Sequence, residues 1–299
     1  MSFCGKLKTE LCNLKTPECC RIAECYGIML FGRFFSSDKI GIQTENEAVA
    51  QNFCYLLRKC FGIYETPVSS NGKRPVHKVY VNNSDDRKKI LEILGNEDIL
   101  YTDILSKECC RASFIRGVFL SCGQCNEPER NPRIDLIIKN EALVPTVIGL
   151  LNDAEIEPNM TVRSGKNVIY LKKSETVEDF ITIMGAGNIT LELMDLKIIK
   201  EVRNNINRRN NAEEANTAKM IEASIKQRNA ISYLIKKEKF DILPEELQEV
   251  ALLRMANKEA TLSELCKLSS FPLTRSGLNH RLKRILEVAE KYGFKGEIK

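Results

Sequence analysis

Apolar residues form the same helical pattern twice along the chain. The first stretch, residues 18–33, reads ECCRIAECYGIMLFGR, and the second, residues 108–123, reads ECCRASFIRGVFLSCG. Aligned on Glu-Cys-Cys-Arg, the two are offset by 90 positions (108 − 18), and Gly27 then matches Gly117 without a gap. The pattern predicts two equivalent apolar helices and hence an internal duplication.

The repetition continues beyond these helices. The segment IGIQTENEAV from Ile40 returns as IDLIIKNEAL from Ile134, and the length differences fall in polar, turn-rich stretches. Asn71-Gly72 and Ser164-Gly165 each predict the turn of a β-hairpin. We therefore expect each copy, at about 16–95 and 106–186, to run α-β-β-α-β-β-α, and both copies to form one α+β domain over residues 1–188.

Capping signals predict where several helices begin. Pro17 and Pro244 are expected at first helical positions, and Ser84 is expected to cap a helix over residues 84–94. The apolar residues near the end of that helix predict its buried side, which comprises Ile90, Leu91, Ile93 and Leu94.

After residue 188 the pattern becomes helical and basic. Residues 197–239 hold eleven Lys and Arg against five Glu, which predicts a basic helical linker over residues 189–240. Three short helices follow, of which the second opens with the capping box Thr261-Leu262-Ser263-Glu264 and the third is capped by Thr274. Residues 241–299 are thus expected to form a helix-turn-helix domain.

The third of these helices has two distinct faces. Leu278, Leu282, Ile285 and Ala289 fall at helical spacing and predict its buried stripe. Residues 275–284 contain no acid, and short polar groups with cations are typical of a helix that enters the major groove of DNA. The candidate DNA-binding residues are Arg275, Ser276, Asn279, His280, Arg281, Lys283 and Arg284, with secondary contacts from Arg203, Arg208 and Arg209. The alternative is a solvated face of a protein-binding domain.

Composition narrows the function classes. Hydrophobic residues make up 43% of the 299 positions without a run long enough to cross a membrane, and no secretory signal is apparent, so we expect a cytoplasmic protein. With only His77 and His280, a Ser/His/Asp or Cys/His catalytic arrangement is not expected.

Twelve cysteines invite a search for a metal site. Cys122 and Cys125 form a C-x-x-C, but Cys110 precedes Cys122 by twelve residues, or about 18 Å along one helix, so the two groups cannot share an ion. Buried, reduced thiols are the better interpretation, and we expect neither a metal nor another cofactor.

A duplicated helix with a central glycine resembles the LAGLIDADG homing endonucleases. The motif's metal-binding acid would fall at Gly32 in the first copy and at Cys122 in the second, and neither residue is a carboxylate. Magnesium-dependent cleavage needs oxygen ligands, so the catalytic site is expected to be degenerate. An active endonuclease remains the enzymatic alternative, with Glu24, Asp38 and Asp135 as the nearby acids.

Taken together, the segments resemble the bacterial WhiA family over nearly the whole chain. The most specific stretches are LPEELQEVALLRMANKEATLSEL, SGLNHRLKRI and YLKKSETVEDFITIMGA. The resemblance implies a non-catalytic transcription regulator that binds promoter DNA in the nucleoid and is linked to sporulation, cell division or chromosome segregation. It also implies a possible WhiB-like or other regulatory protein partner. A protein-interaction scaffold is the remaining alternative.

Overall fold

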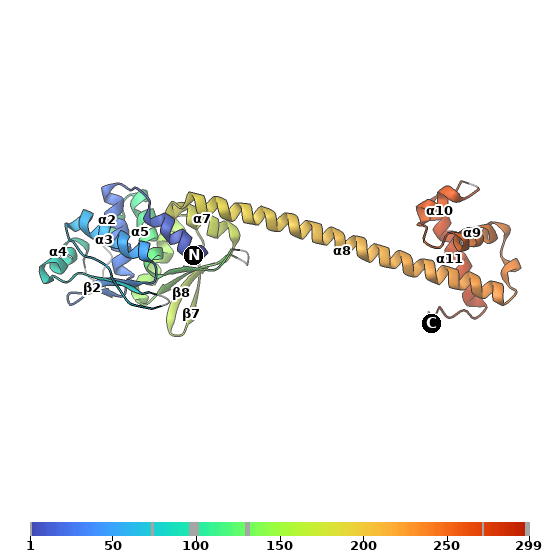
Figure 1. Cartoon of the computed structure of the whole chain (residues 1–299), viewed down its shortest axis with the longest axis horizontal. Helices are drawn as coiled ribbons and strands as arrows, with labels where there is room; N and C mark the ends of the chain where they lie inside the picture. The colour runs from blue at the N-terminus through green and yellow to red at the C-terminus, as the bar shows by residue number, and fades with distance from the viewer. Residues whose placement is uncertain (1, 73–74, 96–101, 129–131, 271, 297–299) are drawn as a thin grey trace. The chain divides into compact units, whose positions relative to one another are not determined.

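The computed structural model describes residues 2–72, 75–95, 102–128, 132–270 and 272–296 (Figure 1). An N-terminal helix, α1 (Phe3–Cys12), precedes two successive copies of one element order. The first copy consists of α2 (Glu18–Leu30), β1 (Phe34–Phe35), β2 (Ile40–Thr44), α3 (Glu47–Phe61), β3 (Val68–Ser69), β4 (His77–Tyr80) and α4 (Ser84–Leu94). The second consists of α5 (Glu108–Cys122), β5 (Gly123–Cys125), β6 (Ile134–Ile138), α6 (Val144–Asp153), β7 (Asn159–Arg163), β8 (Lys166–Leu171) and α7 (Ser174–Met184).

Each copy forms its own four-stranded antiparallel sheet. The strand orders, β1-β2-β4-β3 and β5-β6-β8-β7, are the same when counted within each copy. Equivalent central pairs have equivalent registers, with Ile42 opposite Val79 in one sheet and Leu136 opposite Ile169 in the other. The identical topology confirms the expected duplicated α+β fold.

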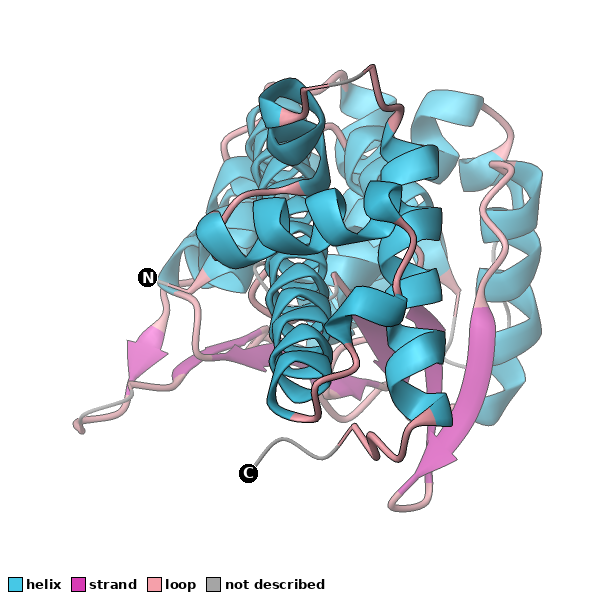
Figure 2. Ribbon diagram, turned by 90° about the vertical axis from the view of Figure 1, so that its right-hand side faces the viewer, coloured by secondary structure: helices cyan, strands magenta, loops and turns pink. Residues whose placement is uncertain are grey.

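Helices cover one face of both sheets. In Figure 1 the helices α2, α3 and α5 lie above the strands of this unit, and Figure 2 shows the strands gathered in the lower part of the view. The buried positions of β6 alternate with half-buried ones, as expected of a sheet with one face against a core. The core therefore lies between the helices and the sheets, and one sheet face stays open.

The helices α2 and α5 pack unusually closely at their glycines. A Cβ atom on Gly27 would overlap the carbonyl oxygen of Phe114, and one on Gly117 would overlap the carbonyl oxygen of Glu24 and lie 3.0 Å from the nitrogen of Ile28. Only hydrogen atoms fit between the two main chains at this point, so glycine is required on both helices.

A buried ion pair crosses the same helix interface. Arg116 Nη2 lies 2.8 Å from Glu24 Oε2, and both side chains are almost fully buried. Asn52 donates to the other oxygen of Glu24 at 2.8 Å, and Arg116 also donates to the carbonyl oxygen of Met184 at 2.9 Å. Because each charge has several partners, this network orients α2, α3, α5 and the end of α7 instead of leaving a buried charge unpaired.

The chain divides into two compact units at Lys200/Glu201, inside the helix α8 (Gly187–Lys236). The second unit contains the later turns of α8 with α9 (Glu245–Ala256), α10 (Leu262–Leu268) and α11 (Arg275–Lys291). Ala230, Ile231 and Leu234 of α8 belong to its core. The three-part division at residues 188 and 240 stays a prediction. None of the described helices is both long and apolar enough to cross a membrane.

Several local predictions need correction. Pro17 and Pro244 are N-caps instead of first helical residues, and Asn83, not Ser84, caps α4 through a bond from the Asp85 amide. Ile93 is 42% exposed, because only one stripe of α4, containing Ile90 and Leu94, faces the core. These shifts of one residue leave the element order unchanged.

We expect Gly117→Ala to lower the free energy of unfolding by at least about 2 kcal/mol, because the added methyl group meets main-chain atoms that cannot rotate away. Gly149→Ala is the matched control. Gly149 lies within α6, and apart from its chain neighbours and the nearby backbone of its own helix no atom lies within 4 Å of its Cβ position. This variant should gain about 0.5–1 kcal/mol in free energy of unfolding. Urea unfolding of both variants measures the difference. Equal effects would contradict the close approach.

Candidate nucleic-acid interface

The helix α11 is fixed in place by its cap and its apolar stripe. The Thr274 hydroxyl accepts a hydrogen bond from the Gly277 amide at 3.1 Å and so begins the helix. Leu278, Leu282, Ile285 and Ala289 are each no more than 1% exposed, which confirms the predicted buried side. The opposite side of α11 is therefore held toward solvent.

Most of the predicted DNA-binding residues lie on this solvent side. The exposed ones are Arg275, Ser276, Asn279, His280, Lys283 and Arg284. They combine short polar groups with cations over less than three helical turns. Side chains of the first kind can hydrogen-bond base edges, and those of the second can neutralise phosphates.

Arg281 differs from its neighbours because it is held within the domain. Its Nη2 atom lies 2.8 Å from Glu246 Oε2 on α9, and its side chain is only 23% exposed. This ion pair joins α9 to α11. Any phosphate contact by Arg281 would compete with Glu246.

The second helix of the motif is defined by its capping box. The Thr261 hydroxyl accepts from the Glu264 amide at 3.2 Å, and the Glu264 carboxylate accepts from the Thr261 amide at 2.7 Å. The hydrogen bond from the Thr261 amide lowers the pKa of Glu264, because it stabilises the charged carboxylate. The predicted cap is confirmed.

The secondary candidates lie on α8. Arg203, Arg208 and Arg209 are all exposed, and every residue from 198 to 219 is exposed. Arg209 forms an ion pair with Glu213 at 2.9 Å, one turn further along. A helix surface of this composition fits a phosphate backbone or water equally well.

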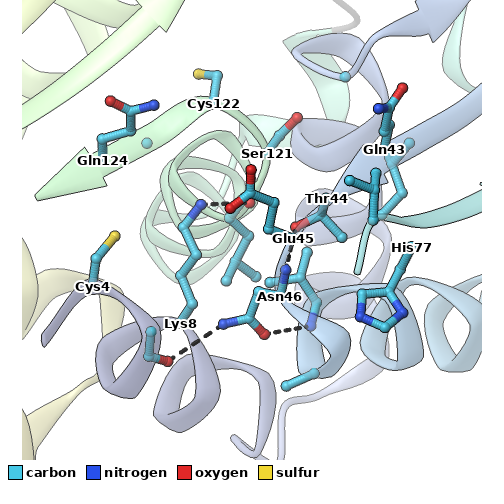
Figure 3. A pocket seen from close by; sticks show the side chains of 18 of the residues that line it. Cys4, Lys8, Gln43, Thr44, Glu45, Asn46, His77, Ser121, Cys122 and Gln124 are labelled. Carbon is cyan, nitrogen blue, oxygen red and sulfur yellow. Dashed lines mark hydrogen bonds between the residues drawn. The ribbon is translucent and has the colours of Figure 1, made fainter. Parts of the chain in front are cut away.

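The two degenerate acid positions border one cavity of about 1250 Å³ in the first unit. Gly32 follows α2 and Cys122 ends α5, and Lys8, Glu45 and Ser121 are among the other lining residues (Figure 3). The cavity thus lies at the carboxyl-terminal ends of the two duplicated helices, where the resemblance places the endonuclease metals.

Lys8 is bound at this helix end. Its ammonium group donates to the carbonyl oxygen of Leu120, in the last turn of α5, at 3.2 Å. The carbonyl end of a helix carries partial negative charge, which attracts cations. Lys8 therefore already provides positive charge beside Cys122.

Neither degenerate position provides a ligand for a hard divalent ion. A Cβ atom on Gly32 would lie 2.9 Å from the carbonyl oxygen of Ile28, so the main chain leaves little room for a longer side chain. Burial raises the pKa of the Cys122 thiol to about 12, which keeps it protonated and a poor ligand for magnesium.

Two of the three nearby acids form ion pairs, and the third is exposed to solvent. Glu24 is bound to Arg116, and Asp135 lies 2.7 Å from Arg133 Nε and 3.3 Å from Arg163 Nη1. Asp38 is exposed in the connection between β1 and β2. Glu24 and Asp135 therefore have structural partners, and the three acids do not form a metal-binding group among the described residues.

A group of four closely spaced cysteines lies at the opposite ends of the same helices, and neither Cys122 nor Cys125 belongs to it. It comprises Cys19, Cys20, Cys109 and Cys110. The sequence analysis missed this group because it considered only the separation of cysteines along a single helix. The 90-residue offset makes Cys19 and Cys20 equivalent to Cys109 and Cys110, and this equivalence was the available signal. The sequence analysis also missed Lys8, whose helix is signalled by a Ser2 cap and by Phe3, Leu7 and Leu11 at spacings of four.

The cavity also contains a thiol with altered acidity. A hydrogen bond from the Cys125 thiol lowers the pKa of Cys4 to about 6, because it stabilises the thiolate. Cys4 is half-buried and lines the cavity. The Cys4 thiol therefore has a neighbour that stabilises its charged form.

We expect Cys4 to react with iodoacetamide at a rate that rises with pH to a midpoint of about pH 6, because the thiolate is the nucleophile. Cys122, with its raised pKa, should stay unlabelled at neutral pH. Peptide mass spectrometry across a pH series measures both, and Cys125→Ala should move the Cys4 midpoint upward. Labelling of Cys4 only above pH 8 would contradict the assignment.

Two family descriptions match the chain. "WhiA LAGLIDADG-like domain" covers residues 111–203, and "WhiA C-terminal HTH domain" covers residues 206–289. Curated relatives are similar over nearly their whole length. A protein of Ruminiclostridium cellulolyticum named "Probable cell division protein WhiA" is 35% identical, over 97% of this chain and 98% of its own. The protein of that name from Bacillus subtilis is 33% identical over 97% of both chains.

Solved structures show the same fold. The full-length DUF199/WhiA crystal structure, described as from Thermatoga maritima, aligns with a TM-score of 0.62 and 22% identity, covering 98% of this chain and all of that one. A crystal structure of the N-terminal LAGLIDADG domain of DUF199/WhiA aligns with a TM-score of 0.51 and 16% identity, over 62% of this chain and 92% of its own.

Proposed function

The chain belongs to the WhiA family, and we propose that it is a non-catalytic transcription regulator that binds double-stranded DNA in promoter regions. The observation that carries the proposal is the polar and basic face of α11, which includes Asn279, Lys283 and Arg284 and is exposed opposite a fully buried stripe. A helix held in this way can enter a major groove with its first turns toward base edges.

In the proposed mechanism the exposed side chains have two roles, base recognition and phosphate binding. Ser276, Asn279 and His280 read base edges, and an asparagine side chain can bond an adenine through two hydrogen bonds. Arg275, Lys283 and Arg284 neutralise phosphates and fix the register of the helix on the duplex. Arg281 contacts a phosphate only when its ion pair with Glu246 breaks. Arg203, Arg208 and Arg209 add secondary phosphate contacts.

The first unit acts as a scaffold without cleavage activity in this proposal. Gly32 and Cys122 provide no carboxylate, and the Lys8 ammonium binds beside Cys122 at the end of α5. These features disfavour the two-metal chemistry that an endonuclease of this fold would need. Of the acids named above, Glu24 and Asp135 instead take part in ion pairs.

The names of the curated relatives support a role in cell division. The curated relatives are named as probable cell division proteins, and we propose the same role here, with links to chromosome segregation or sporulation. The protein would then act in the cytoplasm on nucleoid DNA. A WhiB-like or other regulatory protein partner remains a prediction from the family resemblance.

We expect Arg284→Ala to weaken binding to duplex DNA and to reduce the slope of log affinity against log salt by about 0.9, because one phosphate contact is lost. Lys291→Ala is the matched control: it removes the same charge from α11 two turns later, near the helix end, and should change the slope much less. Fluorescence anisotropy over a salt series measures both. An unchanged slope for Arg284→Ala would favour the protein-interaction alternative.

A further inference from the structure

The first turns of α2 and α5 bring four cysteine side chains together. The sulfur atoms of Cys19, Cys20, Cys109 and Cys110 all lie within 4.8 Å of one another. We propose that these four thiolates form a structural site for one thiophilic divalent metal ion, with zinc as the ion that best fits their number and spacing.

The convergence follows from how the two helices cross. Gly27 faces Phe114 and Val118, and Gly117 faces Glu24 and Ile28. The Cys20 thiol, near the start of α2, lies 3.5 Å from the carbonyl oxygen of Cys109, near the start of α5. The two contacts together show that the helices run parallel and in register, with their amino-terminal ends side by side. Residues 90 apart in sequence thus become neighbours, and each copy supplies two ligands.

The spacing fits a single ion. Tetrahedral zinc has Zn–S bonds of about 2.3 Å, which sets its four sulfurs about 3.8 Å apart. Sulfurs already within 4.8 Å of one another need only small side-chain rotations to reach that geometry. An iron–sulfur cluster must hold several irons and sulfides between its thiolates and needs a wider cage. Four thiolates also favour zinc over magnesium or calcium.

The amino-terminal ends of two helices meet at this point. The amino-terminal ends of two helices carry partial positive charge and unpaired amides, and both stabilise sulfur anions. Neither α2 nor α5 has a side-chain cap: Pro17 and Lys107 precede them without such a bond. Side chains from outside the site therefore do not cap these first turns, although the Cys110 amide already donates to the carbonyl oxygen of Lys107 at 3.0 Å.

Exposure argues against simple apolar packing. Cys20 and Cys110 are buried, but Cys19 is half-buried and Cys109 is exposed. A cysteine kept only as a small hydrophobic residue would lie in the core. The exposed side of the group also gives an ion a path from solvent.

Binding would link the two copies. The ion replaces the four thiol protons, which pass to solvent, and no electron transfer is involved. Since four protein ligands complete a tetrahedral zinc site, no position is left for a substrate, and the role is structural. The ion would fasten the amino-terminal ends of α2 and α5, at the opposite end from the cavity beside Gly32 and Cys122.

The test uses the full chain, purified with reductant, stripped with a chelator and titrated with zinc or cobalt. We expect one zinc per chain and, with cobalt, the absorption bands of a tetrahedral thiolate complex. Zinc should also raise the thermal midpoint. Cys109→Ser is suited to the test because its side chain is exposed, and it should weaken zinc affinity roughly ten-fold or more and abolish the midpoint rise.

Cys54→Ser is the matched control, since Cys54 is half-buried on α3 and outside the group, and it should bind zinc like the wild type. Cys19→Ser tests the other copy and should resemble Cys109→Ser. The proposal is overturned if the folded wild type shows no thiolate–cobalt bands, if Cys109→Ser and Cys54→Ser bind zinc equally, or if the reduced preparation contains a disulfide within the group.

Discussion

Where α2 and α5 cross, two main chains touch with only glycine hydrogens between them, and the first unit depends on this contact. Packing this close requires Gly27 and Gly117 on facing surfaces. It also fixes the helices parallel and in register. The sheets of the two copies then follow from the same local sequence pattern, and the Glu24–Arg116 pair is enclosed where the helices meet.

The same contact determines what lies at each end of the helix pair. At the carboxyl ends, Gly32 and Cys122 border a cavity in which Lys8 supplies positive charge, and neither of these two positions offers a carboxylate. At the amino ends, four cysteines converge. The helix pair thus has a cationic side chain at the end where the motif would place its acids and thiol groups at the other end. Magnesium prefers oxygen ligands to either of these groups.

Sequence pattern was sufficient where local rules decide the structure. The 90-residue repeat predicted two equal sheets, and the capping box at Thr261 and the Leu278–Ala289 stripe predicted the form and orientation of α11. It was insufficient where distant segments meet. Glu246 and Arg281 are 35 positions apart, and their contact depends on how α9 packs against α11. The cysteine group likewise depends on contact between two helices, which spacing along one helix does not predict.

The central claim is that the protein recognises DNA sequence without cutting it. The most direct test is to incubate the full chain with genomic DNA fragments at near-physiological salt, with and without magnesium. The bound fragments are then sequenced. The proposed function predicts enrichment of a limited set of promoter fragments, recovered intact under both conditions. Magnesium-dependent cleavage would contradict the assignment of Gly32 and Cys122 as degenerate positions, and the absence of any enriched fragment would contradict DNA recognition by α11.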